Sequence, residues 1–288
     1  MKITNESGLP EPVYQALIRN DYSRGNSNRS VTQLIDSPRV RILRKEHNED
    51  ITEDASDMVW AVLGTAVHKM FEEQDVDGHV IEERLYAEVD NWVISGAIDL
   101  QRDEGDGTVT LLDYKCTSVW SVIYGKIEWE QQLNFYAWLV RDSKQQSVSA
   151  LKIIAVLRDW QRTKAEHDSS YPQAPIVAVD IKLWSEEEQD AYVRERVRLH
   201  QNAEFARLTG GDLPPCSDKE RWKKNDVYAL KKKGGKRAVK LFDSMEEAEA
   251  ALQEGQEIEQ RLGAFTRCDA DWCRVARFCD QGGARASE

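Results

Sequence analysis

The sequence predicts a mixed α/β fold, of the α+β type, in which helices flank a mixed central sheet and a C-terminal appendage follows the core. Residues 54–73 carry apolar side chains at three- and four-residue steps, as an amphipathic helix does. Strand-like stretches follow within residues 79–115, and a helical stretch at 128–142 precedes two more of them. This order of elements is the basis of the predicted fold.

The N-terminal residues 1–53 are expected to form a helical segment. Residues 30–47 begin with Ser and Val-Thr, continue with apolar residues at helical spacing, and are interrupted at Pro38. Proline disrupts a helix interior, so we expect the helical material to be divided there.

The core domain is expected to span residues 54–210. Alternation and β-branched content predict strands at 79–89 and 92–100, and the Gly-containing stretch "DEGDG" predicts a hairpin before the strand that begins at Thr108. The segments that complete this core are strands at 150–160 and 175–184 and a helix that starts at Ser185 with acidic residues in its first turn.

Residues 211–288 are expected to form the appendage. The sequence "VYALKKKGGKRAVKLF" predicts a hairpin turning at Gly234 and Gly235. Residues 244–262 are predicted to be one further helix, and the chain ends in a cysteine-rich stretch.

Composition limits the classes of protein that the chain can belong to. With 288 residues, 41% hydrophobic and 31% charged, it is expected to be an ordinary soluble globular protein. The N-terminus has no apolar signal region and no stretch is apolar enough to span a bilayer, so we expect a cytoplasmic protein of a bacterium or a phage-infected cell, without membrane contact. A net charge of −12 argues against a general nucleic-acid coat, yet residues 219–240 hold ten Lys and Arg residues that could form one basic arm.

Two acidic residues stand at the ends of neighbouring predicted strands. Small side chains precede Asp99 on its face of the strand, and Asp113 follows Val109 and Leu111 on the face that it shares with Lys115. If the strands pair as a hairpin, Asp99 and Asp113 converge. Two carboxylates in one place favour a cation between them, and oxygen ligands suit Mg²⁺ or Mn²⁺. Such a site, with a lysine beside it, is typical of phosphodiester hydrolysis, although an isolated D-x-K is usually an ordinary ion pair.

Three further residues lie where they could complete this site. Gln132 and Tyr136 are four residues apart on the next predicted helix and share a face. His68 lies on the preceding helix, with Gly64 one turn earlier. Each alone is better explained as a structural residue, but together they form an ordered set.

The motifs "GTAVH", "GAID", "LLDYK" and "QLNFY", within residues 64–136, resemble those of the PD-(D/E)XK nucleases, and in particular the RecB-like branch with its CRISPR-adaptation and phage exonucleases. "SVTQLIDSPR" and "LPPCSDKERW" are looser matches to phage members. The resemblance implies a restriction-endonuclease-like core. It also implies that the metal ligands are His68, Asp99, Asp113 and the main-chain carbonyl of Tyr114. Lys115 would be the catalytic lysine, and Gln132 and Tyr136 would be the accessory motif. Glu83 or Glu88 could assist a ligand.

Four of the five cysteines lie near the C-terminus, at Cys216, Cys268, Cys273 and Cys279. Four thiolates can hold a Zn²⁺ ion or an iron–sulfur cluster, and unligated cysteines remain an alternative. The RecB-like branch often carries a 4Fe–4S cluster. The five residues between Cys273 and Cys279 agree with the last cysteine interval of that branch. The first interval is four residues rather than two, and Cys216 follows the core rather than preceding it. These two departures leave the metal open: an iron–sulfur cluster is the leading prediction and zinc the alternative. Either metal would hold the C-terminal tail to the body and stabilise the appendage.

The residues expected to contact DNA are Lys231, Lys232, Lys233, Lys236 and Arg237 of the basic hairpin, and Trp120, which could stack on an unpaired base. The leading hypothesis is a Mg²⁺- or Mn²⁺-dependent exonuclease that acts on linear duplex or single-stranded DNA in recombination, repair or phage replication. A single-strand annealing protein or recombinase is the partner that the family resemblance implies. The alternatives are a noncatalytic DNA-binding or assembly subunit with the same fold, and a zinc-clipped regulatory protein in which the D-x-K is accidental.

Overall fold

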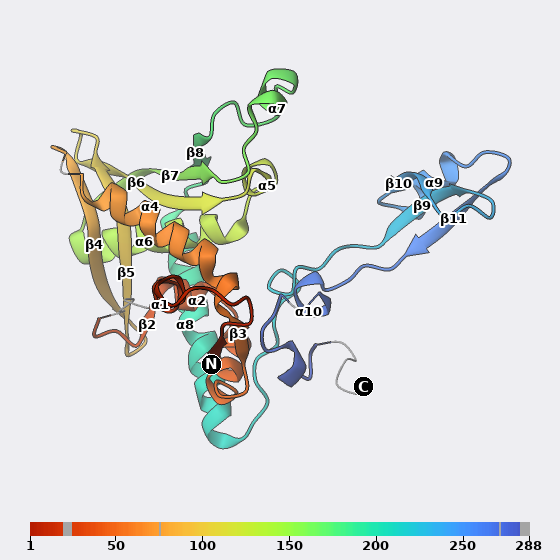
Figure 1. Cartoon of the computed structure of the whole chain (residues 1–288). Helices are drawn as coiled ribbons and strands as arrows, with labels where there is room; N and C mark the ends of the chain where they lie inside the picture. The colour runs from red at the N-terminus through yellow and green to blue at the C-terminus, as the bar shows by residue number, and fades with distance from the viewer. Residues whose placement is uncertain (20–24, 75, 271, 283–288) are drawn as a thin grey trace. The chain divides into compact units, whose positions relative to one another are not determined.

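A computed structural model describes residues 1–19, 25–74, 76–270 and 272–282, and these divide into two compact units (Figure 1). The first unit contains residues 1–36 and 52–211, and the second contains residues 37–51 and 212–288. The first unit has, in order, β1 (Lys2–Thr4), α1 (Glu11–Ile18), β2 (Arg29–Ser30), α2 (Val31–Ile35), β3 (Thr52–Asp54), η1 (Ala55–Met58), α4 (Val59–Glu72), β4 (His79–Val89), β5 (Trp92–Asp103), β6 (Thr108–Thr117), α5 (Val119–Ile123), α6 (Ile127–Lys144), β7 (Ser147–Leu157), α7 (Arg162–His167), β8 (Ile176–Ile181) and α8 (Glu186–Thr209). That residues 54–210 fold as a separate core stays a prediction.

The central sheet has six strands, with β2, β5, β6, β7 and β8 in that order and β4 paired with β5. The β4–β5, β5–β6 and β7–β8 pairs are antiparallel, whereas β6–β7 and β2–β5 are parallel. A parallel pair needs a crossover connection, and α6 supplies it between β6 and β7. The predicted mixed α/β fold with a mixed central sheet is confirmed.

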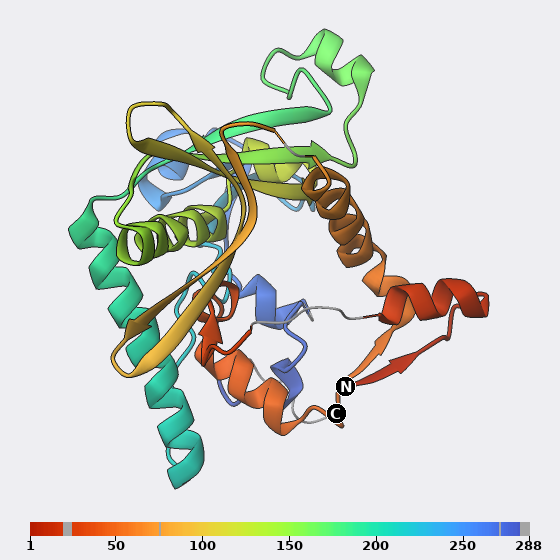
Figure 2. The ribbon, with the colours of Figure 1, turned by 90° about the vertical axis from the view of Figure 1, so that its left-hand side faces the viewer.

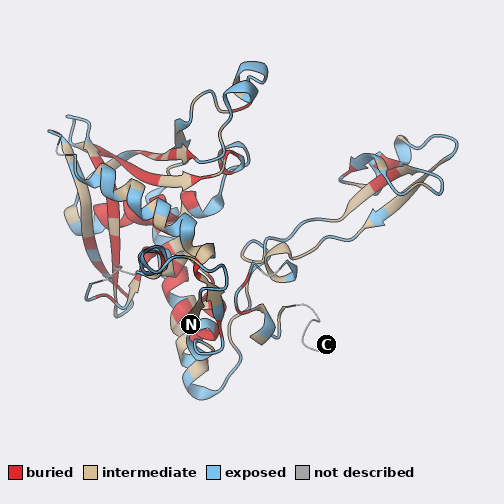
Figure 3. Ribbon diagram, viewed as in Figure 1, coloured by how far each residue is buried: buried red, intermediate tan, exposed pale blue. Residues whose placement is uncertain are grey.

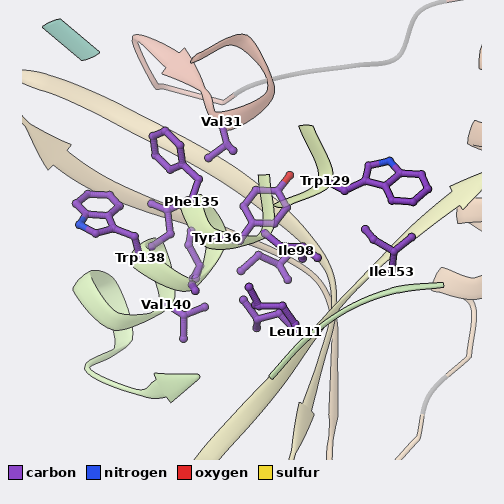
Figure 4. Packing of buried hydrophobic residues seen from close by; sticks show 14 of the residues in the cluster. Val31, Ile98, Leu111, Trp129, Phe135, Tyr136, Trp138, Val140 and Ile153 are labelled. Atoms are coloured by element: carbon purple, nitrogen blue, oxygen red, sulfur yellow. The ribbon is translucent and has the colours of Figure 1, made fainter. Parts of the chain in front are cut away.

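Helices α4 and α6 lie on opposite sides of this sheet (Figure 2). The core is built between the sheet and α6, where Leu133, Phe135 and Leu139 are fully buried. Figure 4 shows Phe135 among the other packed side chains of this core. Gly96 of β5 permits this packing, because a Cβ atom there would lie 2.7 Å from Leu139 and from Tyr136. The close approach of α6 brings Gln132 and Tyr136, which are also buried, to the sheet.

Helix α4 behaves differently from the helix that its apolar spacing predicts. The 3₁₀ helix η1 directly precedes it, and none of the residues of α4 is buried (Figure 3). Trp60 and Met70 are 53% and 57% exposed. The helix is therefore confirmed, but it lies at the edge of the core rather than within it.

Helix α8 packs on the other side of α6 and begins as its sequence predicts. Ser185 caps the helix by accepting a hydrogen bond from the main-chain N–H of Glu188, and the Glu188 carboxylate accepts one from the main-chain N–H of Ser185. Further along, the buried Arg196 donates hydrogen bonds to the main-chain carbonyls of Leu34 and Asp36. Helix α8 therefore anchors α2, whose residues lie beside the site described below.

The second unit contains α3 (Pro38–Glu46), β9 (Val227–Lys232), β10 (Ala238–Phe242), α9 (Met245–Ala250), β11 (Gln256–Arg261), α10 (Thr266–Asp269) and η2 (Ala276–Phe278). Helix α3 starts at Pro38, so the predicted interruption is confirmed, and the predicted hairpin is formed by β9 and β10. The single helix predicted at 244–262 is wrong. It ends at Ala250, and β11 pairs with β9 instead. Gly255 at φ +79° permits the turn, and pairing with β9 outweighs the helix propensity of the Glu and Gln residues in β11.

In the part of the chain that the structure describes, no helix has the length and apolar character needed to cross a membrane.

Candidate active site

The candidate site lies where β5 and β6 separate. Their pairing runs from Asp103–Val109 to Leu100–Leu112 and stops there. Continued by one step, the same register would pair Asp99 with Asp113. The gap is bridged by the Asp99 side chain, whose Oδ2 accepts a hydrogen bond of 2.7 Å from the main-chain N–H of Tyr114. The end of the β5–β6 pairing thus places both carboxylates at one opening in the sheet.

A third carboxylate, that of Glu82, enters the site through a break in β4. Residues two apart in a regular strand share a face, yet Ile81 lies beside Phe71 of α4 whereas Glu83 contacts Lys144 of α6. Glu82 between them has φ +51°, a conformation that is uncommon outside glycine and is concentrated at functional sites. The register pairs Ile81 with Leu100 and Glu83 with Ile98, and it skips Glu82 and Asp99 between them. The distorted backbone therefore adds Glu82 to the site.

His68 of α4 connects these groups. Its Nε2 donates a hydrogen bond of 2.9 Å to the main-chain carbonyl of Tyr114, and its Nδ1 lies 3.5 Å from Asp99 Oδ2 and 4.0 Å from Glu82 Oε1. Each of His68, Glu82 and Asp99 offers one ligand atom within 4.8 Å of the other two. One nitrogen and two carboxylate oxygens at this spacing could hold a divalent metal ion.

The electrostatics of the site favour a bound cation. Burial and the nearby charge of Asp113 raise the pKa of the Asp99 carboxyl to about 7. A hydrogen bond with Glu82 raises the pKa of His68. Burial and repulsion from Glu82 also raise the pKa of Glu72, one turn further along α4. Carboxylates that repel one another in this way are stabilised when a positive ion lies among them.

The second group of polar side chains surrounds Asp113, which is buried. Gln132 Nε2 donates hydrogen bonds of 2.9 Å to Asp113 Oδ1 and to Tyr136 Oη. Lys115 Nζ forms an ion pair with Asp113 Oδ2. The α6 helix thereby orients the carboxylate while the ammonium group neutralises it.

All these side chains line one cavity of about 740 Å³, which we call the acidic cavity. Its charged lining residues are His68, Lys69, Glu72, Glu82, Arg84, Asp99, Asp113 and Lys115. The sequence-predicted residues His68, Asp99, Asp113, Lys115, Gln132 and Tyr136 all line it, and the carbonyl of Tyr114 adjoins it.

The acidic residue that sequence reasoning missed is Glu82. Glu83 or Glu88 was predicted instead, but Glu83 pairs with Lys144, and Glu88 is exposed opposite Val93. The sequence signal for Glu82 was the run of three charged residues from Glu82 to Arg84. A regular strand cannot place all three on its solvent-facing side, so the run indicates an irregular backbone.

Trp120 lies on α5, five residues after Lys115, and is 53% exposed. Its ring stacks on Tyr124, with centroids 5.8 Å apart, and Tyr124 is 79% exposed. Trp60 of α4, next to the cavity residue Ala61, is also exposed and lies under the Arg158 guanidinium. The first unit thus carries several exposed aromatic rings close in sequence to cavity residues.

In the basic hairpin of the second unit, Lys231 differs from the other predicted DNA contacts. It forms ion pairs with Glu257 and Glu259 of β11. Within the described residues, no ion pair involves the exposed side chains of Lys232, Lys233, Lys236 or Arg237. These four therefore remain accessible to an anionic partner, whereas Lys231 is largely neutralised.

The four C-terminal cysteines all belong to the second unit. Cys216 Sγ lies 3.0 Å from Ser37 Oγ, and Cys279 Sγ lies 3.8 Å from Arg39 Nη1. Burial raises the pKa of the Cys216 thiol to about 11 and also raises that of Cys273. Nowhere in the described ranges do three cysteine sulfurs lie within 4.8 Å of one another. The described residues thus show no formed cysteine metal site.

Comparisons with known proteins identify the family of the chain. One solved structure, described as the crystal structure of SSO0001, is 16% identical, with a TM-score of 0.43, over 65% of this chain and 84% of that one. No curated protein matches the chain. The model of the PD-(D/E)XK nuclease superfamily matches residues 78–280, which is more than half of the sequence. The chain therefore belongs to the PD-(D/E)XK nuclease superfamily.

Proposed function

We propose that this protein is a metal-dependent deoxyribonuclease that hydrolyses phosphodiester bonds as an exonuclease, with Mg²⁺ or Mn²⁺ in the acidic cavity. A nuclease domain implies a nucleic-acid substrate. The observation that carries the proposal is the group of His68, Glu82 and Asp99 beside the Asp113–Lys115 pair. Nitrogen and carboxylate ligands next to an ammonium group suit metal-assisted phosphodiester hydrolysis.

The proposed ligands are His68, Glu82, Asp99 and Asp113, together with the main-chain carbonyl of Tyr114. When bound, a divalent ion polarises a phosphoryl oxygen and lowers the pKa of a coordinated water. The chain orients these ligands through hydrogen bonds, because Tyr114 N–H holds Asp99 and Gln132 holds Asp113.

Lys115 is the proposed catalytic lysine. In the described structure its ammonium group pairs with Asp113, so a cation that occupies the carboxylate would release the ammonium toward the substrate. There it would orient the attacking water and stabilise negative charge on the phosphoryl group. Gln132 and Tyr136 hold the Asp113 carboxylate in place from α6.

The path of the DNA strand is proposed from two surfaces, each on its own unit. The stacked, exposed rings of Trp120 and Tyr124 offer a face on which unpaired bases can stack. In the second unit, Lys232, Lys233, Lys236 and Arg237 offer exposed charges for backbone phosphates.

The mode of cleavage can be tested with end-labelled DNA. Purified protein is incubated with Mg²⁺ or Mn²⁺ and with linear duplex, linear single-stranded and closed circular DNA of the same sequence. An exonuclease releases mononucleotides or short products from linear DNA and leaves the circles intact. A chelator added before the metal should abolish all cleavage, because the proposed site depends on the ion.

Each other outcome has a defined meaning. Cleavage of circular DNA contradicts the exonuclease and indicates an endonuclease. DNA binding without cleavage under every condition contradicts catalysis and favours a noncatalytic subunit with the same fold.

For the cysteines we propose a structural metal in the second unit, an iron–sulfur cluster with zinc as the alternative. Burial chiefly raises the pKa of Cys216 and Cys273, and the charge of other cysteines adds to it, which indicates that these thiols lie near one another. The sulfurs do not converge in the described structure, so the proposal requires local rearrangement when a metal binds.

Metal analysis of anaerobically purified protein tests this assignment. We expect iron and labile sulfide, or zinc, to co-purify with the wild type and to be lost in Cys273→Ser. The matched control is Cys116→Ser, which changes the cysteine of the first unit and should leave the metal content unchanged. Absence of both metals from the wild type contradicts the proposal.

A further inference from the structure

Arg84 of β4 is a half-buried cation of the acidic cavity that forms no ion pair in the described structure. No hydrogen bond or ion pair joins its guanidinium to another residue in the described part of the chain. It follows Glu82 by two residues and lies opposite Ala97 in the register. Arg84, the small Ala97 and the metal-binding group therefore line one cavity.

Lys69, another cation of the cavity, is exposed to solvent, and the charged groups nearest the proposed metal are already engaged. Lys115 pairs with Asp113, and His68 lies between Glu82 and Asp99. A partly buried guanidinium that makes no hydrogen bond loses solvation without compensation. Arginine presents five N–H donors in a fixed planar arrangement, which matches the oxygens of a phosphate or carboxylate. The carboxylates that surround the proposed metal are its proposed ligands, so they are not available to pair with Arg84. The geometry therefore suits an anion that enters the cavity as the partner of Arg84.

We propose that Arg84 forms a phosphate subsite of the acidic cavity and binds a phosphate of the nucleic-acid strand next to the one at the metal. The buried Ser30 and the exposed Thr32 line the same cavity and bring hydroxyl groups to it. This inference rests on the proposed nucleic-acid substrate and adds a binding residue to it. Arg84 is here a positioning residue, because it holds the strand and not the reacting atoms.

Two sources of phosphate share this chemistry. An internal phosphate of the backbone would be bound in any strand that crosses the cavity. A terminal phosphate would be bound only at a strand end, and it would carry more negative charge. The probes therefore include oligonucleotides of one sequence that carry either a phosphate or a hydroxyl at the 5′ or the 3′ end.

Binding is measured by fluorescence anisotropy with Mg²⁺ in the Asp113→Asn background, which prevents cleavage during the measurement. The second substitution is Arg84→Gln. The matched control is Arg102→Gln on β5, which removes an equal charge from an arginine that pairs with Glu104 and does not line the cavity. Titrations at several salt concentrations give the slope of log K against log [salt].

We expect Arg84→Gln to weaken binding about tenfold or more, since it removes hydrogen bonds to a charged group. The salt slope should become shallower by about 0.9 for duplex and about 0.7 for single-stranded probes, because one phosphate contact is lost. A merely structural arginine would not change the slope. An effect confined to one type of phosphorylated end assigns the subsite to a terminal phosphate, and an equal effect on all probes assigns it to the backbone.

Unchanged affinity and slope in Arg84→Gln overturn the inference while leaving the proposed function intact. Failure of the background protein to bind any probe overturns the proposed function as well. Thermal melting establishes that the variants fold. Should Arg84→Gln unfold, Arg84→Lys serves instead, since it keeps the charge but loses the planar donor pair. It should retain the slope and bind more weakly, and wild-type affinity in Arg84→Lys then overturns the inference.

Discussion

Asp113→Asn is expected to lower the rate of DNA hydrolysis by roughly a thousandfold or more. Asp113 is buried, accepts a hydrogen bond from Gln132 and pairs with Lys115. Its replacement by a neutral amide removes a proposed metal ligand and leaves the ammonium group without a partner. Metal ions supply several kcal/mol of transition-state stabilisation, and about 4 kcal/mol corresponds to that loss in rate. Single-turnover digestion of labelled linear DNA at saturating Mg²⁺ measures it.

The neighbouring residues Glu82 and Glu83 provide a matched comparison for this experiment. Glu82 belongs to the group that could hold the metal, whereas Glu83 pairs with Lys144 outside the acidic cavity. Glu82→Gln should therefore raise the metal concentration needed for activity by about 10- to 100-fold, and Glu83→Gln should not change it. Equal metal dependence in both variants would show that Glu82 is not a ligand, and full activity in Asp113→Asn would remove the proposed mechanism.

Asp99→Asn is expected to make the metal-free protein more stable at pH 8 and to abolish the stabilisation that Mg²⁺ gives. The pKa of the Asp99 carboxyl is raised from 3.8 to about 7 in the folded state. The folded protein therefore binds the proton more tightly than the unfolded chain does. Between about pH 4 and pH 7 this group lowers the free energy of unfolding as the pH rises, by at most about 1.4 kcal/mol per pH unit, and the loss is complete above that range.

His68 acts in the same direction, because its pKa is also raised and its stabilising contribution is lost as the pH rises. Urea unfolding of the wild type and Asp99→Asn at several pH values, with chelator and with Mg²⁺, separates these contributions. The two proteins should converge near pH 4 and diverge toward pH 8. Parallel pH profiles of the free energy of unfolding would show that Asp99 does not cause the loss of stability as the pH rises. Stabilisation of Asp99→Asn by Mg²⁺ equal to that of the wild type would place the ion elsewhere.

Much of the fold could be predicted because local patterns and tertiary packing agree in the first unit. Alternation identified β4, β5 and β6, and the capping residue Ser185 identified the start of α8. The agreement fails at β11, where Glu and Gln residues favour a helix but pairing with β9 decides the outcome. Sequence alone does not reveal that β9, which pairs with β10 on one side, accepts β11 on the other.

The candidate site was predictable to the extent that it depends on regular geometry. Asp99, Asp113 and the Gln132–Tyr136 pair follow from strand hairpins and helical spacing, and the structure brings them to one cavity. Glu82 and Arg84 depend on an irregular backbone and on an unpaired charge. Periodicity predicts neither of these features, because both arise from a single φ angle and from the space that surrounding side chains leave open.

The interleaving of the two units determines how the protein can be divided. Because residues 37–51 belong with residues 212–288, the chain passes from one unit to the other three times. Arg39 of α3 donates hydrogen bonds to the carbonyls of Leu213 and Pro214, which a truncation after residue 211 would remove. A shortened protein that ends there would keep α3 without its binding partners. Neither unit is a contiguous fragment, so a functional half must be designed by rejoining the chain and not by deleting its end.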